Sequence, residues 1–206
     1  MEIALPRVLT SADLADFRDR LIAAASRIFA AKGREGFTMR EVAGALGVSP
    51  MTPYRYFKDK DEILAAVRAR AFDRFSDALE KAHARGGSAL ERSNAVGEAY
   101  VKFAFGETAS YRLIFDLAQP DEAQYPDLAR ASERARKTMT DHVHGLVDAG
   151  LLEGDPVLIG HVFWATLHGA VVLELAGKLS PDYDFRTISN EAFRALSIGY
   201  APKAQS

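Results

Sequence analysis

Apolar residues recur at three- and four-residue steps along nearly the whole chain, and this spacing predicts amphipathic helices. The first such stripe comprises Leu14, Phe17, Leu21, Ala25, Ile28 and Phe29. Runs that alternate apolar and polar residues are few, and clusters of β-branched residues are rare, so strands are not predicted. The pattern therefore predicts an all-α fold.

Polar residues mark where the helices begin. Thr38 is followed by Glu41, and Asp59 by Glu62. This is the spacing of a capping box, in which two residues satisfy each other's backbone at a helix N-terminus. Glycines that follow the apolar stripes predict the helix ends. Beyond the N-terminal quarter of the chain, helices are expected over about 60–84, 88–105, 109–117, 126–149, 156–178 and 185–200.

Two short helices joined by a turn at Gly47 are predicted near the N-terminus. Thr38 caps the first; Ser49 caps the second, with Pro50 at its first position, where no backbone N–H is needed. These are the proportions of a helix-turn-helix, whose second helix enters the DNA major groove. Pro53 removes at most one more hydrogen bond, so both prolines stiffen a protruding helix end that then loses less entropy on binding.

The charge distribution supports a division at this point. Residues 1–60 carry ten Lys or Arg and seven Asp or Glu, a net charge of +3, whereas residues 61–206 carry sixteen and twenty-one, a net charge of −5. A basic part on an acidic remainder indicates that only the N-terminal part meets a polyanion. We therefore expect a helix-turn-helix domain over 11–60 and a larger helical domain over 61–200.

The side chains of the second short helix suit DNA. The methyl and methylene groups of Pro50, Met51 and Thr52 match contacts with thymine methyl groups. Donors of the kind that hold phosphates follow at Tyr54, Tyr56, Lys58 and Lys60. The alternative is that Tyr54, Tyr56 and Phe57 are core aromatics and that Arg55 and Lys58 belong to a solvated face.

Composition narrows the class of protein. Apolar residues make up 48% of the 206 residues and cysteine is absent, which indicates a globular protein without disulfides or thiolate metal sites. The start of the chain lacks the basic flank and apolar run of a signal peptide. The most apolar segment, 158–177, contains His161, His168 and Glu174, so it is predicted to be a buried helix of a cytoplasmic protein and not a membrane span.

A longer ordered pattern covers residues 20–64. It comprises Leu21, Ile22, Ala25, Ile28, Phe29, Gly33, Gly36, Thr38, Val42-Ala43, Leu46-Gly47-Val48-Ser49, Tyr54, Phe57, Lys60 and Ile63-Leu64. This pattern resembles the DNA-binding domain of tetracycline-repressor (TetR) family transcription regulators. The resemblance implies an all-helical homodimer whose first three helices bind double-stranded DNA and whose remainder binds a small-molecule effector and dimerises.

The resemblance also implies roles for single residues. Arg40 matches a residue that often reaches a base, Pro50–Thr52 match base-facing positions, and Tyr54 and Lys60 match phosphate contacts. The candidate DNA-binding set is Thr38, Arg40, Ser49, Pro50, Met51, Thr52, Tyr54, Arg55, Tyr56, Lys58 and Lys60. Pro53 departs from the family, which has an inward-packing Leu or Ile there, and this leaves the register of the base contacts open.

Trp164, His168 and Gly169 resemble the Trp-x3-His-Gly segment of one subgroup of these regulators, and residues 111–116 resemble another segment of it. This second resemblance implies that the last two long helices, about 157–200, pair with those of a partner in a homodimer.

Trp164 and His168 lie four residues apart and therefore share a helix face. They could form walls of an effector pocket for an apolar or aromatic molecule, since such sites are mostly apolar with few polar groups. The candidate ligand-binding set is Tyr100, Phe103, Phe105, Tyr111, Phe115, Trp164 and His168. The alternative is that Trp164 is a core residue, that His168 is a hydrogen-bonded buried histidine, and that Gly169 permits close helix contact.

Enzyme motifs are absent: the sequence has no Gly-x-Ser-x-Gly, no phosphate-binding Gly-rich loop and no His-Glu-x-x-His. His142 and His144 are predicted to be surface residues and a poor metal pair, because they lie on different helix faces. We predict no catalytic activity, no cofactor and no metal site. The predicted function is a ligand-responsive regulator that represses from a palindromic operator; the alternatives are a small-molecule-binding helical protein with weak or non-specific DNA binding, and a helical hydrolase or lyase.

Overall fold

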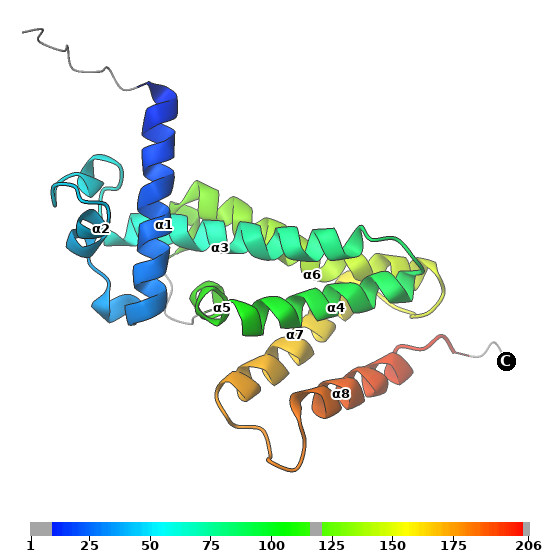
Figure 1. Cartoon of the computed structure of the whole chain (residues 1–206). Helices are drawn as coiled ribbons and strands as arrows, with labels where there is room; N and C mark the ends of the chain where they lie inside the picture. The colour runs from blue at the N-terminus through cyan, green and yellow to red at the C-terminus, as the bar shows by residue number, and fades with distance from the viewer. Residues whose placement is uncertain (1–9, 116–120, 204–206) are drawn as a thin grey trace, which may run out of the picture. The chain divides into compact units, whose positions relative to one another are not determined.

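The computed structural model describes residues 10–115 and 121–203 (Figure 1). These residues form helices, turns and loops without a strand, which confirms the predicted all-α fold. The α-helices are α1 (Ser11–Gly36), α2 (Met39–Ala45), α3 (Lys60–His83), α4 (Ala89–Gly106), α5 (Thr108–Phe115), α6 (Pro126–Asp148), α7 (Pro156–Leu175) and α8 (Phe185–Gly199), and the 3-10 helices are η1 (Pro53–Arg55) and η2 (Glu122–Gln124).

The chain divides into two compact units. In the described part, the head unit comprises residues 10–70 and 121–129, and the body unit comprises residues 71–115 and 130–203. Helices α3 and α6 therefore contribute residues to both units. The domain limits of 11–60 and 61–200 stay a prediction.

The predicted cap and turn of the head unit are present. At the start of α2, the Thr38 hydroxyl accepts the Glu41 N–H at 3.2 Å, as the capping box requires. Helix α2 ends at Ala45, and Gly47 follows in the turn with a φ of 66°, in the left-handed region; the N–H groups of Gly47 and Val48 donate to carbonyls of α2. A residue with a Cβ would be strained there, so Gly47 fixes the direction in which the chain leaves α2.

The helix predicted after Gly47, with Pro50 at its first position, is wrong. The Thr52 N–H donates to the Ser49 carbonyl at 2.8 Å in a turn, and only Pro53–Arg55 form a helical segment, the 3-10 helix η1. An α-helix starting at Pro50 would need the N–H that Pro53 lacks, so three-residue bonds replace the α-helical ladder. We call residues 49–58 the stub.

A glycine lets two helices of the body unit approach closely. A Cβ at Gly160 of α7 would lie 2.8 Å from the Cα of Thr140 in α6. Around this contact Val143, Ile159 and Phe163 are buried, and Phe163 meets Phe193 of α8 edge-on at 5.3 Å. Helices α6, α7 and α8 therefore share one hydrophobic core, and α7 and α8 lie side by side (Figure 1).

Helix α7 is only partly buried, so the prediction of a buried helix is corrected. By length and hydropathy alone, α7 could cross a membrane. Of its most apolar stretch, 33% is buried in the protein. Its buried face includes Phe163 and Val171, whereas Leu158 and Leu173 on other faces are exposed. The helix is apolar all round, so one face contributes to the core and another is left uncovered within this chain.

Candidate nucleic-acid interface and effector site

The stub presents most of the predicted DNA-binding residues to solvent. Met51 is 67% exposed and Tyr54 is 48% exposed. Thr52 is half-buried. The other exposed residues of the predicted set include Arg40, Ser49, Pro50, Arg55 and Lys58. The stub packs beside α2, so these side chains gather at one end of the head unit.

Buried residues anchor the stub. Pro53 and Phe57 are buried, and the Arg18 guanidinium lies over the Phe57 ring, 4.9 Å from its centre. The Tyr56 ring packs against Phe17 of α1 at 5.1 Å. The core alternative therefore describes Phe57 and part of Tyr56, but not the exposed Tyr54. Pro53 packs inward, as the family's Leu or Ile would.

Two predicted DNA-binding residues are engaged inside the head unit. Thr38 is exposed, but its hydroxyl belongs to the capping box. The Lys60 ammonium donates to the Arg34 carbonyl at 2.6 Å and lies 5.8 Å from the centre of the Phe37 ring. A phosphate contact by Lys60 stays a prediction, and it would require the ammonium to leave this carbonyl.

The body unit gathers most of the predicted ligand-binding residues into one aromatic cluster. Phe115 of α5 meets His168 of α7 at 4.9 Å and Trp164 at 6.0 Å between ring centres. Phe75 of α3 packs edge-on against Tyr100 at 5.5 Å and Phe103 at 5.2 Å. We define the aromatic cluster as Phe72, Phe75, Tyr100, Phe103, Tyr111, Phe115, Trp164 and His168.

Sequence reasoning missed Phe72 and Phe75 and included a residue that lies elsewhere. Phe72 and Phe75 lie three residues apart on the buried face of α3, and this spacing was a signal that could have identified them. Phe105 is 38% exposed and packs against Phe185 at 5.3 Å. The structure therefore does not bring Phe105 together with the other candidates.

Three polar atoms form a triangle inside the aromatic cluster. The Tyr100 and Tyr111 hydroxyls lie 2.8 Å apart, and His168 Nδ1 lies 3.0 Å from the Tyr100 hydroxyl and 2.7 Å from the Tyr111 hydroxyl. Tyr100 is 0% exposed and Tyr111 is 1% exposed. Buried polar groups need such partners, so the triangle stabilises this arrangement of α4, α5 and α7.

Burial keeps the triangle uncharged. Desolvation raises the pKa of Tyr100, with further contributions from Tyr111, and it also raises the pKa of Tyr111. Desolvation lowers the pKa of His168 below its usual value of 6.5. Both phenols and the imidazole are therefore neutral near pH 7.

Trp164 contributes an indole N–H beside the triangle. Its Nε1 is buried, and no described side chain or backbone group accepts from it with normal hydrogen-bond geometry. It lies close enough to the Tyr100 hydroxyl to lower the pKa of that group slightly, against the larger effect of burial. The cluster therefore holds a donor whose hydrogen-bonding capacity is not fully used.

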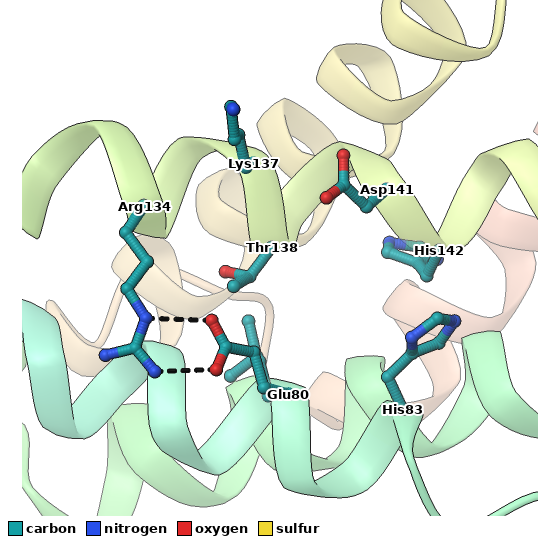
Figure 2. A pocket seen from close by; sticks show the side chains of 8 residues that line it. Glu80, His83, Arg134, Lys137, Thr138, Asp141 and His142 are labelled. Carbon is teal, nitrogen blue, oxygen red and sulfur yellow. Dashed lines mark hydrogen bonds and ion pairs between the residues drawn. The ribbon is translucent and has the colours of Figure 1, made fainter.

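A pocket of about 180 Å³ lies in the body unit between α3 and α6, apart from the aromatic cluster (Figure 2). Arg134 lies on its wall and donates to Glu80 at 2.6 Å, to Asp77 at 2.6 Å and to Asp73 at 3.4 Å. Figure 2 shows His83 and His142 projecting toward each other at the opposite end.

His142 corrects the prediction of a surface histidine. Its Nδ1 lies 2.9 Å from the Ser93 hydroxyl of α4. Burial, together with the neighbouring His83, lowers the pKa of His142 to about 4. His144 is exposed, as predicted. Within residues 10–115 and 121–203, no group of three or more potential ligands could hold a metal ion.

Comparisons with known proteins match both parts of the chain. The family model of bacterial regulatory proteins of the tetR family matches residues 21–67, and the model of the tetracyclin repressor-like C-terminal domain matches residues 93–196. Membership of the Trp-x3-His-Gly subgroup stays a prediction.

Relatives and solved structures agree with these models. The chain is 32% identical over 136 residues to the HTH-type transcriptional activator FasR of Mycolicibacterium smegmatis, a match that spans 65% of this chain and 61% of that relative. A Rhodococcus sp. RHA1 protein of unknown function has 27% identity and a TM-score of 0.78, with 90% of this chain and 95% of that chain covered. The regulator FadR of Bacillus subtilis, solved with stearoyl-CoA, has 19% identity and a TM-score of 0.69, with 88% and 98% covered. Since the C-terminal model alone matches half of the chain and the N-terminal model matches its head, the protein belongs to the TetR family of bacterial regulatory proteins.

Proposed function

We propose that the protein is a ligand-responsive, DNA-binding transcription regulator that acts in the cytoplasm, where its DNA is accessible. The observation that carries this proposal is the exposed stub of a head matched by the TetR N-terminal model. Family membership supports the same conclusion.

The exposed side chains suit separate tasks on a duplex. Met51 at the tip carries an apolar group that fits a thymine methyl, and Thr52 combines a methyl group with a hydroxyl. Tyr54, Arg55 and Lys58 are donors suited to phosphate oxygens. We propose that Met51 and Thr52 select the DNA sequence. The donors at Tyr54, Arg55 and Lys58 would hold the protein in position on the DNA backbone.

A selection of bound fragments from random DNA, followed by a salt titration, tests this proposal. A regulator should prefer its selected operator to random duplex by roughly a thousandfold or more, and its affinity should fall steeply with salt. Equal affinity for all duplexes would instead support the alternative, a small-molecule-binding protein with non-specific DNA binding.

We propose a homodimer formed through α7 and α8, about residues 157–200. The exposed apolar side chains Val157, Leu158, Val172, Leu173 and Ile198 support it, because two copies of one such surface can cover each other about a two-fold axis. Gly169 supports it too, since a Cβ there would meet no atom within 4 Å in this chain. Replacement of Leu173 by Asp should shift the sedimentation coefficient to that of a monomer, whereas replacement of the exposed Leu14 of α1 should not.

We propose that the effector binds at the aromatic cluster and is largely apolar. Aromatic walls with a few polar groups are the composition of small-molecule sites. FadR, which shares the fold, was solved with stearoyl-CoA, a molecule with a long apolar chain. Effector binding and DNA binding should oppose each other by the same coupling free energy.

The direction of regulation has two candidates. Release of the protein from a palindromic operator by the effector would make it a repressor. Identity of 32% to the activator FasR favours activation as the second candidate. In vitro transcription from a template with the selected operator decides between them: a repressor lowers the transcript yield and the effector restores it, whereas an activator raises the yield.

A further inference from the structure

The hydrogen atoms of the aromatic cluster can be assigned from its geometry. The shortest contact, 2.7 Å, joins the Tyr111 hydroxyl to His168 Nδ1, and the Tyr100 hydroxyl lies 2.8 Å from that of Tyr111. A buried phenol donates its single hydrogen to a partner, and two hydroxyls cannot each donate to the other, so at least one of Tyr100 and Tyr111 donates to Nδ1. The proton of the neutral imidazole is then on Nε2.

This assignment leaves the cluster with donors to offer. The Trp164 N–H has no acceptor of normal geometry among the described residues. The proton of His168 is on Nε2, because Nδ1 contacts the tyrosine hydroxyls. Trp164 and His168 are half-buried, whereas Tyr100 and Tyr111 are buried. The buried indole N–H of Trp164 is thus a donor inside the cluster that a bound molecule could satisfy, beside the rings of Phe115 and the tyrosines.

The cluster itself contains no side chain with a permanent charge. Four charged or titratable groups on the neighbouring helices are engaged elsewhere: Arg68 with Glu122 at 2.9 Å, Arg74 with Glu107 at 3.1 Å, Arg112 with the Leu175 carbonyl at 3.2 Å, and His161 with the Val157 carbonyl at 2.8 Å. A carboxylate placed among these rings would lose its hydration without gaining a counter-charge. It would bind only with uptake of a proton, by itself or by His168.

We propose that the effector presents to Trp164 and His168 an uncharged hydrogen-bond acceptor, the carbonyl of an ester, thioester, amide or ketone, on an apolar body, and not a free carboxylate. This inference rests on the proposed effector site and deepens it. The indole and imidazole N–H groups donate to the carbonyl oxygen, and the aromatic rings contact the chain next to it.

Trp164 makes the test direct, because it is the only tryptophan in the chain. Decanoic acid, its methyl ester and its N-acetylcysteamine thioester differ at the head group and share one apolar chain. Titration of the full-length protein, followed by Trp164 fluorescence, gives the affinity of each below its aggregation limit. The ester and thioester should bind at pH 7.5 about tenfold or more tightly than the acid, because the acid is almost fully ionised at this pH and binds only with uptake of a proton.

The pH dependence adds a second readout. Binding of the acid should strengthen about tenfold for each unit of pH decrease between 8 and 6, because one proton is taken up. Binding of the ester should hardly change while His168 stays neutral. Equal or tighter binding of the acid at pH 7.5, with no dependence on pH, would overturn the inference and leave the effector site standing.

A matched pair of variants locates the interaction. Tyr111→Phe keeps the ring but removes the hydroxyl that holds His168, so the ester should bind several-fold more weakly; Tyr183→Phe, at an exposed tyrosine outside the cluster, should bind it as the unmodified protein does. Thermal melting of both variants checks that they are folded. If no probe alters Trp164 fluorescence, this inference and the effector site fail together, while operator binding in the same sample separately tests the DNA-binding function.

Discussion

The stub and the aromatic cluster both use tyrosines, yet their surroundings give these residues opposite properties. Tyr54 is 48% exposed on a turn that two prolines keep out of a regular helix, and its hydroxyl is available to a partner. Tyr100 is 0% exposed between helices, and its hydroxyl is held by Tyr111 and His168. Residue type alone therefore does not distinguish a contact surface from a core. The local backbone conformation and the hydrogen-bond partners of the hydroxyl make that distinction.

The largest expected effect tests whether the cluster carries stability and the stub does not. Tyr100→Ala removes a buried ring and one corner of the hydrogen-bonded triangle, leaving Tyr111 and His168 with only their mutual contact there, so the free energy of unfolding should fall by about 3–5 kcal/mol. Tyr54→Ala should change it by less than about 0.5 kcal/mol. Urea denaturation followed by circular dichroism measures both. Similar losses for the two variants would remove the distinction.

The next effect concerns His142, a half-buried polar residue of the body unit. The unfolded chain protonates His142 near pH 6.5, whereas the folded protein resists protonation until about pH 4. The unfolded state therefore binds more protons in this window. The free energy of unfolding should decrease as the pH falls from 6.5 to about 4, by at most roughly 3 kcal/mol, and should be unaffected by this group above pH 6.5.

Variants isolate the contribution of His142 from that of titrating carboxylates. His142→Gln should reduce the slope of the stability profile between pH 6.5 and 4 relative to the unmodified protein, because the unfolded state then gains no proton at this position; the lowered pKa of His168 leaves part of the slope. His144→Gln, at the exposed histidine two residues away, should retain the full slope. An unchanged slope in His142→Gln would show that the imidazole is already hydrated in the folded state.

A smaller effect is expected from packing between helices of the body unit. Gly160→Ala places a Cβ 2.8 Å from the Thr140 Cα, so α6 and α7 must separate slightly, and the free energy of unfolding should fall by about 1–3 kcal/mol. Gly97→Ala in α4 meets no atom within 4 Å and should stabilise the helix by up to about 1 kcal/mol. A lower melting temperature for Gly160→Ala together with a higher one for Gly97→Ala would confirm the contact. Melting temperatures that shift in the same direction would contradict it.

The smallest free-energy changes are expected at the stub, where they appear in DNA binding. Tyr54→Ala should weaken binding to operator and random duplex alike, by about threefold to tenfold, because a phosphate contact carries no sequence information. Thr52→Ala should instead alter which operator variants are preferred. Fluorescence anisotropy with a panel of operator variants separates these outcomes, and a change of preference in Tyr54→Ala would assign that residue to a base.

Local patterns in the sequence predicted the helices well because capping is a local interaction. The box at Thr38, the Asp59 carboxylate that accepts the Glu62 N–H at 2.9 Å, and the turn at Gly47 depend on residues within a few positions of one another. The conformation of the stub was harder to predict. Each proline alone is compatible with the first turn of a helix, but a helix that begins at Pro50 needs the N–H that Pro53 lacks. The hydrogen bonds that form η1 follow from the combination.

The candidate site was predictable only where its residues share a helix. Trp164 and His168 follow from their spacing, but the partners of His168 lie 57 and 68 positions away. Nothing local to Phe105 shows that α4 turns it toward Phe185 and away from the cluster. Likewise, the Ser93 hydroxyl that contacts His142 is 49 positions away, so the sequence contains no sign that this half-buried histidine has a partner within the protein.

Arg134 has a further consequence for the acidic face of α3. Asp73, Asp77 and Glu80 recur about one turn apart; without this guanidinium Asp77 and Glu80 would repel each other, while Arg130 would still pair with Asp73 at 3.4 Å. Added salt weakens attraction between opposite charges and also relieves repulsion between like charges. Ionic strength should therefore slightly destabilise the intact protein and stabilise Arg134→Met, so that a single side chain determines the sign of the salt response.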